Sequence, residues 1–328
     1  MKIKMSPAIA LWLLAPVFGE LLSSSTPLKE YLSPFFILIF GMLYGSGAVL
    51  VRELLIRWQK GWASLILLGL AYGIYEEGLV VRSFFDPNWV DLGKLGSYGR
   101  VAGVNWVWAE HLSVYHALIS MGASIVFVEI LYYQKRRECW VGERGLAGNI
   151  LAFSATLPIG AFLSPYNTPD VWLGLSWLAV IGLTVAARRV PATAKAPRRV
   201  KVPPPACFWW TGFLATFIQL FIIYKTSENA VPVFGVTMIL IALFDLGVLG
   251  LVLRWNGDGQ DWDDRHRIAL INGAMTLFLV LVPLLAREKC PVTPITSPVF
   301  IVGLWWISRK VNKRVMRERS RATQDSHT

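Results

Sequence analysis

Two apolar segments of the chain carry acidic and histidine side chains at close spacing. GLAYGIYEEGLVVRSFF (69–85) contains a pair of adjacent glutamates, and NWVWAEHLSVYHALISMGAS (105–124) contains a glutamate and two histidines. A charged group inside a bilayer costs roughly 2.5–3.5 kcal/mol on insertion scales, so such groups usually mark function. Adjacent buried carboxylates cannot both ionise at low cost, and a nearby histidine adds a second proton station or a donor to an oxyanion. The candidate catalytic residues are Glu76, Glu77, Glu110, His111 and His116.

Helical geometry ranks these five residues. At 100° per residue, one polar stripe of the second segment contains Glu110, Ser113, His116 and Ser120. In the first segment, Glu77 continues the line of Gly69 and Gly73, whose G-x-x-x-G spacing lets helices approach closely. A second G-x-x-x-G pattern at 41–45 predicts contact between the two glycine-containing helices. We expect one site, with Glu76, Glu77 and His116 in first rank and Glu110 and His111 in second.

A structural alternative stays open for the same residues. Glu77 would then pair with Arg82 or Arg100 in an ion network, which also perturbs pKa values without any catalysis. The one-site hypothesis requires Glu77 and His116 to lie within about 10 Å, because acid–base partners must reach a common atom.

The two histidines do not form a metal motif. His111 and His116 are five residues apart, so they point in different directions, whereas the H-E-x-x-H motif places two histidines on one helix face. His111 instead shares a side with Trp108 and Tyr115, which is typical of the aromatic belt at a membrane interface. A zinc site would be possible only through Glu76 or Glu77 together with one histidine. We predict neither a metal nor a cofactor.

A long connection joins the two segments. FDPNWVDLGKLGSYGRVAGVN (85–105) is longer than a plain connection needs, and such loops over a site are often lids; an ordered cap without motion is the alternative. Glu20, near the end of the first apolar block, is expected on the same side of the membrane. The residues that could complete a pocket are Glu20, Asp86, Asp91, Tyr98 and Arg100.

The elements that must position these groups are membrane-spanning helices. The chain is 55% hydrophobic and 16% charged, whereas soluble chains carry about 25% charged residues. The apolar residues form blocks long enough to cross a bilayer, which predicts an all-α polytopic bundle. The predicted spans are 7–24, 34–52, 62–83, 105–133, 145–163, 171–187, 207–225, 229–253, 267–286 and 295–308.

The distribution of positive charge gives this bundle an orientation. With the N-terminus inside, the inner segments hold 25 of the 32 lysines and arginines, so ten spans with both termini in the cytoplasm follow from the positive-inside rule. The Glu/His group then lies in the outer half of the bilayer, beneath the 85–105 loop. We predict a plasma-membrane protein whose basic inner loops and tail contact anionic lipids; the net charge of +11 does not indicate nucleic acid.

A basic, proline-rich stretch divides the chain. Residues 188–206 predict a cytoplasmic linker between a six-span part, 1–187, which carries the Glu/His group, and a four-span part, 207–308; residues 309–328 form a basic tail. In the second part, Asp245 and Gln219 are the polar residues expected deep in spans.

The glutamate pair followed by histidines on the next helix resembles the CPBP family of CAAX-processing and bacteriocin-processing intramembrane proteases. That family has EExxxR, then FxxxH, then a third histidine motif. Here Glu76 and Glu77 match the pair, and Arg82 comes one residue late. His111 or His116 could match the second motif, but Val107 or Leu112 stands where it has phenylalanine, and no later segment matches the third motif. The resemblance implies that a glutamate activates water and a histidine stabilises the oxyanion, in a site that faces the cytoplasm in that family.

Three functions are consistent with this sequence. The first is a metal-independent intramembrane hydrolase acting on a peptide, a lipid or a small molecule. The second is a proton-coupled small-molecule transporter with the same residues as proton stations and Asp245 on the path; its ten short-looped spans resemble drug/metabolite transporters in topology. The third is a non-catalytic membrane scaffold.

Overall fold

The computed structural model describes residues 4–23, 25–164, 166–192, 201–256, 262–285 and 293–325. Residues 193–200 of the predicted linker and residues 326–328 of the tail lie outside these ranges. Within them helices and their connecting loops make up the chain, and the strands form one short hairpin, in which β1 (Arg100–Val101) pairs with β2 (Val104–Asn105). The predicted all-α class is confirmed.

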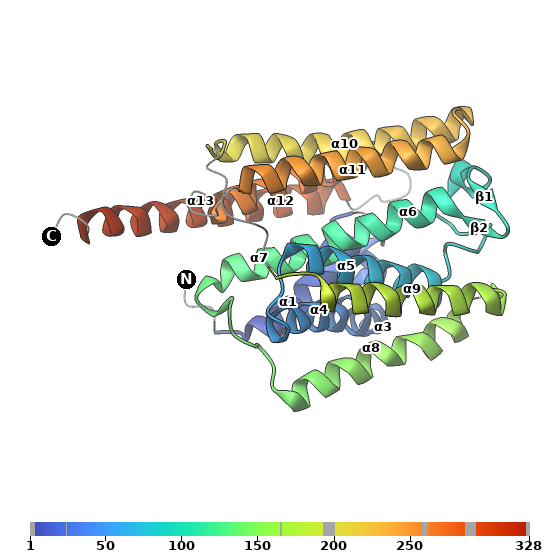
Figure 1. The fold of residues 1–328 in the computed structure, drawn as a ribbon, viewed down its shortest axis with the longest axis horizontal. Coiled ribbons are helices and arrows are strands. Elements are labelled where there is room, and N and C mark those ends of the chain that lie inside the picture. The colour runs from blue at the N-terminus through green and yellow to red at the C-terminus, as the bar shows by residue number, and fades with distance from the viewer. Residues whose placement is uncertain are drawn as a thin grey trace. The chain divides into compact units, whose positions relative to one another are not determined.

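The helices follow the apolar blocks of the sequence (Figure 1). They are α1 (Pro7–Pro16), α2 (Leu28–Tyr31), α3 (Pro34–Phe40), α4 (Ser46–Arg57), α5 (Trp62–Ile74), α6 (Trp106–Tyr115), α7 (Ser124–Leu131), α8 (Glu143–Leu163), α9 (Asp170–Arg189), α10 (Pro205–Asn229), α11 (Phe234–Asn256), α12 (Asp264–Leu285) and α13 (Thr293–Asp325). π-helical segments extend or join several of them: Val17–Leu21, Gly41–Gly45, Tyr75–Val80 and His116–Ala123.

Seven of the continuous helices in the described ranges are long and apolar enough to cross a membrane. They are Pro34–Arg57, Trp62–Val80, Trp106–Leu131, Glu143–Leu163, Asp170–Arg189, Pro205–Asn229 and Phe234–Trp255. The first predicted span corresponds to a shorter apolar helix, Pro7–Leu21, and the last two lie in α12 and α13. A multi-pass arrangement of helices is therefore established, while the number ten and the orientation stay predictions.

The chain forms two compact units. The first contains Met1–Gly19, Lys29–Ala194 and Phe221–Ile241, and the second contains Glu20–Leu28, Lys195–Leu220 and Ala242–Thr328. The first unit holds all the candidate catalytic residues. The division of the chain at the basic linker stays a prediction.

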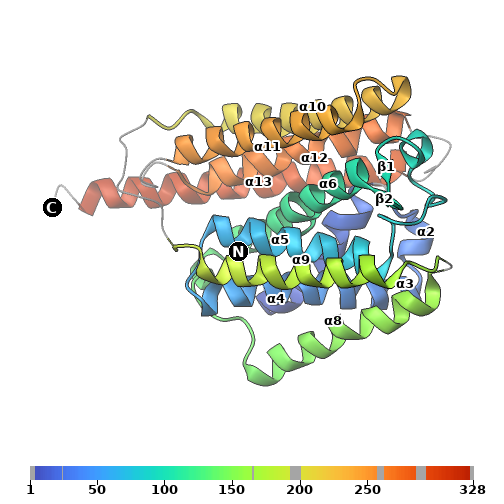
Figure 2. The same cartoon turned by 45° about the vertical axis from the view of Figure 1, so that its right-hand side comes forward.

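In the first unit, α5 is packed between α9 and the helix that continues from α6 (Figures 1 and 2). Glycines on α5 allow the second of these contacts. A Cβ at Gly69 would lie 2.6 Å from the Cα of Ala117, and one at Gly73 would lie 3.0 Å from the Cα of Ser113. Real side chains do not approach so closely, so these positions need glycine for the helices to meet at this distance.

The 85–105 loop forms a folded cap with its own apolar core. Phe85, Leu92 and Leu95 are buried there together with Trp108 of α6. Asn105 joins the cap to the helix: its side chain accepts a hydrogen bond from the backbone N–H of Trp108 (3.0 Å) and donates to the carbonyl of Leu95 (2.5 Å). This N-cap fixes where α6 begins, and hence the register of the histidines behind it.

At the other end of the first unit, a buried arginine ties α4 to the loop after α7. The guanidinium of Arg52 is 1% exposed; it pairs with Glu53 (3.0 Å) and lies 3.7 Å from the ring centre of Trp140. It also donates to the carbonyl oxygens of Glu138 (2.6 Å) and Arg136 (3.0 Å). The arginine thus satisfies loop carbonyls that would otherwise be left without partners.

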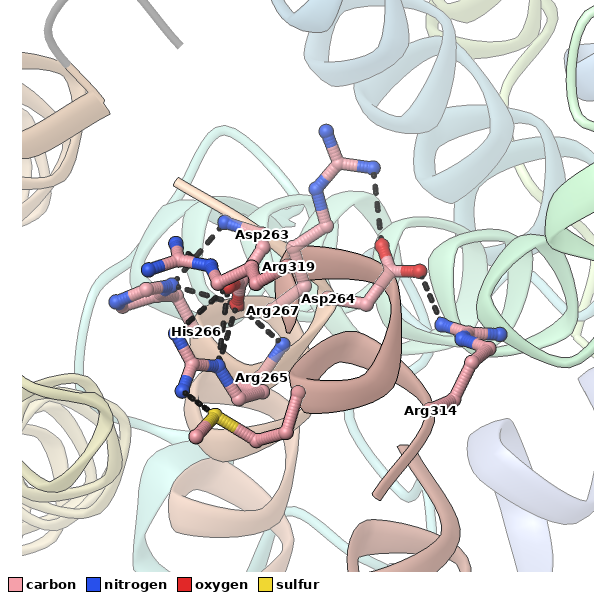
Figure 3. Close-up of polar contacts among 8 residues, drawn as sticks. Asp263, Asp264, Arg265, His266, Arg267, Arg314 and Arg319 are labelled. Atoms are coloured by element: carbon pink, nitrogen blue, oxygen red, sulfur yellow. Dashed lines mark hydrogen bonds and ion pairs between the residues drawn. The ribbon is translucent and has the colours of Figure 1, made fainter. Parts of the chain in front are cut away.

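In the second unit, α12 and α13 pack along each other (Figure 2). A hydrogen bond from Asn272 to Ser308 (2.7 Å) joins them within their apolar parts. At the start of α12, Asp264 pairs with Arg314 (2.5 Å) and Asp263 with Arg319 (3.0 Å), as Figure 3 shows. These pairs fix which face of α13 points away from α12.

Candidate functional site

Glu76, Glu77 and His116 form one buried group. Their exposed fractions are 3%, 7% and 2%. Nε2 of His116 lies 2.8 Å from Oε1 of Glu77, and Nδ1 lies 3.3 Å from Oε2 of Glu76. The predicted proximity of Glu77 and His116 is confirmed. We call these three residues the Glu–His–Glu triad.

Each member of the triad lies in a π-helical segment. The two glutamates belong to Tyr75–Val80, and the histidine is the first residue of His116–Ala123. In a π-helix the wider turn rotates side chains out of the α-helical register, and such segments occur frequently at functional sites. The change from α-helix to π-helix at these residues was not predicted from the sequence.

The other two π-helical segments of the described chain also reach this place. Tyr44, in Gly41–Gly45, has its ring centre 6.1 Å from that of His116. Gly19, in Val17–Leu21, accepts a hydrogen bond at its carbonyl from the hydroxyl of Tyr115 (2.9 Å). The four π-helical segments therefore meet at His116 and at its neighbour Tyr115.

Aromatic rings enclose the imidazole. Besides Tyr44, the rings of Tyr72 and Tyr115 have their centres 5.8 Å and 5.3 Å from that of His116. Such an environment has a low local dielectric, in which hydrogen bonds and charges interact more strongly than in water.

A serine outside the helical pattern holds Glu77. The hydroxyl of Ser83 donates to Oε2 of Glu77 in a short hydrogen bond, and Nε1 of Trp108 donates to the same hydroxyl (3.1 Å). Ser83 reaches back because Arg82 has a left-handed conformation with φ +63°, which turns the chain directly after the helix. Sequence periodicity missed Ser83, because the contact depends on this turn.

On its other side, His116 meets a serine of its own helix. Nδ1 of His116 lies 3.0 Å from Oγ of Ser120. The sequence placed Ser120 on the polar stripe of this helix, and the contact follows from that spacing. Ser83, Glu77, His116 and Ser120 thus form a continuous hydrogen-bonded row.

The second-ranked residues lie beside the triad. His111 is 6% exposed, and its ring lies 5.9 Å from that of Trp108 and 6.5 Å from that of Tyr115, as its shared helix side predicted. The ring is enclosed by helices instead of facing the surface where an aromatic belt would lie. Its Nδ1 has no hydrogen-bond partner among the described residues. Glu110, the residue before His111 in α6, is half-buried.

The arginines of the structural alternative bind backbone oxygens. Arg82 donates to the carbonyl of Tyr166 (3.2 Å), and Arg100 donates to those of Phe85 (2.8 Å) and Gly96 (2.9 Å). Within the described ranges, neither forms an ion pair with Glu77.

The residues proposed for a lid or pocket have separate roles. The hydroxyl of Tyr98 lies 2.6 Å from both the carbonyl of Pro232 and Oγ1 of Thr237, so it fastens the cap. Asp86 accepts from the backbone N–H of Asn88 (2.8 Å), and Asp91 is exposed. Glu20 belongs to the second unit, where it accepts a hydrogen bond from Thr26 (2.5 Å).

The triad also meets the spacing requirement of a metal site. Glu76, Glu77 and His116 each offer one ligand atom, and these atoms all lie within 4.8 Å of one another. Three protein ligands of nitrogen and oxygen type would suit a divalent cation such as Zn²⁺ with an open position. A glutamate of this pair together with one histidine is the only zinc route that the sequence left open.

Residues 9–325 match the model of an uncharacterized membrane protein family. The chain belongs to this family. The match spans both compact units, so the membrane assignment of the family applies to the chain as a whole and agrees with its seven long apolar helices. No curated protein and no solved structure matches the chain.

Proposed function

We propose that this family member is an intramembrane hydrolase whose catalytic group is the Glu–His–Glu triad. The observation that carries the proposal is the imidazole of His116 held between two carboxylates, at 2.8 Å from Glu77 and 3.3 Å from Glu76. A histidine oriented by one carboxylate and adjacent to a second has the components of general acid–base catalysis.

The roles follow from the contacts. Glu77 is fixed by Ser83 and His116, so it orients the imidazole and stabilises its protonated form. Glu76 takes a proton from a water molecule as the water oxygen attacks a carbonyl carbon. Protonated His116 stabilises the oxyanion and then gives its proton to the leaving group as the bond to that group breaks. The products are a carboxylic acid and the protonated leaving group.

The resemblance to the CPBP proteases supports the same division of labour. Glu76 and Glu77 match that family's glutamate pair, and His116 supplies the histidine of the next helix. A peptide or lipid carbonyl within the bilayer is accordingly the substrate class that we propose, with no metal required for the attack.

The proposed topology has ten spans with both termini in the cytoplasm. The proposed location is the plasma membrane. The support for the topology is the charge distribution, with 25 of the 32 basic residues on the inner side. In this orientation the triad belongs to the outer half of the bilayer.

Hydrolysis in H₂¹⁸O tests the function. Purified protein in proteoliposomes is incubated with peptide and phospholipid pools, and mass spectrometry detects product carboxyl groups that carry ¹⁸O. We expect the wild type to produce them and Glu77→Gln to lose more than about 100-fold of the rate. Asp245→Asn is the matched control, since it removes a buried carboxylate that contacts Gln219 (3.0 Å) in the second unit; it should leave the rate unchanged.

The hydrogen-bonded row from Ser83 through Glu77 and His116 to Ser120 favours a proton-coupled transporter as the second candidate. Such a row can pass a proton along alternating donors and acceptors. For a transporter, proton uptake into the same proteoliposomes would be lost in both Glu77→Gln and Asp245→Asn. Loss of uptake without any ¹⁸O-labelled product would contradict the hydrolase.

A further inference from the structure

The last helix continues far beyond what a membrane span requires. α13 has 33 residues, whereas about 20 cross the hydrocarbon core. Its first half presents apolar side chains outward, with Val299 and Val302 more than 60% exposed and Trp305 and Trp306 about half exposed. Such a surface suits lipid chains and ends in the paired tryptophans typical of a membrane interface.

Contacts with α12 fix the rotation of α13 from Ser308 onward. Val311 and Val315 are buried, and Arg314 and Arg319 are occupied by Asp264 and Asp263 (Figure 3). Arg314 therefore serves the packing of the two helices, and Arg319, although about half exposed, is paired with Asp263.

The opposite face carries a different set of basic residues. At 100° per residue, Trp306, Arg309 and Lys313 fall within about 60° of one another, away from Val311 and Val315. Arg309 lies 4.1 Å from the ring centre of Trp305, and Lys310 lies 3.3 Å from that of Trp306. The cationic groups thus lie one to two helical turns after the tryptophans. This distance along the helix places them in the headgroup layer.

We propose that Arg309, Lys310 and Lys313 form a binding site for the phosphate of anionic phospholipids at the membrane surface. The apolar stem and tryptophans place the site at headgroup depth, and its charge complements the phosphate. The inference rests on α13 crossing the bilayer, which is part of the proposed topology, and is independent of hydrolysis by the triad.

Distance from the membrane separates this site from the rest of the basic tail. Arg317 and Arg321 continue the same helix face, but at 1.5 Å per residue they lie roughly 16 Å and 22 Å beyond Trp306. Counted from Lys313, the last residue of the proposed site, they lie roughly 6 Å and 12 Å further along the helix. The Debye length in physiological salt is about 8 Å, so Arg317 is partly screened from headgroups bound at the site and Arg321 largely so.

Two charge-matched double variants of the full-length protein test the site. Arg309→Gln/Lys313→Gln removes the proximal pair, and Arg317→Gln/Arg321→Gln removes the distal pair with the same i,i+4 spacing. Each is titrated in neutral detergent with phosphatidylglycerol, phosphatidylcholine and inorganic phosphate, and binding is measured by native mass spectrometry. Each headgroup contact contributes about fivefold, so we expect the proximal variant to bind phosphatidylglycerol about 20-fold more weakly and the distal variant to change less than about threefold.

Equal weakening in both variants, or in neither, would overturn the proposal, as would equally tight binding of phosphatidylcholine or free phosphate. Arg314→Gln separates lipid binding from folding. It should lower the thermal unfolding midpoint by breaking the pair with Asp264, yet retain the wild-type affinity for phosphatidylglycerol. Because none of these measurements involves the triad, the result leaves the test of hydrolysis unaffected.

Discussion

Glu77 and His116 lie 39 residues apart in the chain, yet Oε1 of the glutamate is 2.8 Å from Nε2 of the histidine. The bond crosses between two membrane helices at the point where both change from α to π geometry. Each partner has a further contact, with Ser83 for the glutamate and Ser120 for the histidine. The pair is therefore oriented from both sides, as a reacting acid–base pair requires.

Ser83→Ala should lower hydrolysis by about tenfold, because it removes the hydroxyl that orients the Glu77 carboxylate; the comparable partners that orient metal-binding side chains contribute about 10–100-fold. Ser83→Thr keeps the hydroxyl and should restore most of the rate, which distinguishes positioning from general loss of folding. Ser97→Ala is the control, since Ser97 is exposed on the cap and donates to the carbonyl of Lys94 (3.4 Å). The rate of ¹⁸O incorporation into product is measured for all three variants.

Gly69→Ala should destabilise the protein by about 1–3 kcal/mol, because the new methyl group would lie 2.6 Å from the backbone of Ala117. Gly182→Ala in α9 is the matched control: nothing lies within 4 Å of its added Cβ, so higher helix propensity should make it neutral or stabilising by up to about 1 kcal/mol. Denaturant unfolding in detergent compares them. Equal stability of the two variants would contradict the close helix contact.

Arg52→Ala should cost about 3–5 kcal/mol of unfolding free energy, because it removes the closest cation (3.0 Å) from the buried carboxylate of Glu53, which Arg57 approaches only to 3.5 Å. Lys225→Ala is the control, because it removes a 56% exposed lysine whose partner Glu228 (3.0 Å) is 50% exposed. Exposed pairs contribute about 0–1 kcal/mol, so the second variant should remain near wild-type stability. A similar loss in both would show that Arg52 does not anchor the loop.

Asp263 should make stability depend on pH in acid. Burial opposes its ionisation, but hydrogen bonds from His266 and Arg265 outweigh burial and hold the pKa of this carboxyl below its ordinary value. A lowered pKa stabilises the fold above the unfolded value, near 4, and this contribution is lost as the pH falls through the folded value. The thermal midpoint of the wild type should therefore fall more steeply below about pH 4 than that of Asp263→Asn.

The sequence by itself determined the membrane class, most helix positions and the identity of the triad. A bilayer demands long apolar helices, and a charged group within one is costly, so the charged residues of two apolar segments gave five candidates, of which helical geometry ranked Glu76, Glu77 and His116 first. Helical periodicity also placed Glu77 on the same line as Gly69 and Gly73, which is the face that meets His116.

Only the tertiary structure decided how the triad is held and which charges are paired. The G-x-x-x-G patterns predicted contact of their two helices, and Tyr44 and Tyr72 do pack at 5.9 Å, but Gly69 itself packs on Ala117. Ser83 reaches Glu77 through a left-handed turn. Arg314 is paired within the fold because Asp264 lies opposite it, whereas its neighbour Lys313 lies on the outer face. Periodicity describes one helix at a time, whereas these contacts depend on turns, π-helical segments and partners brought in from distant parts of the chain.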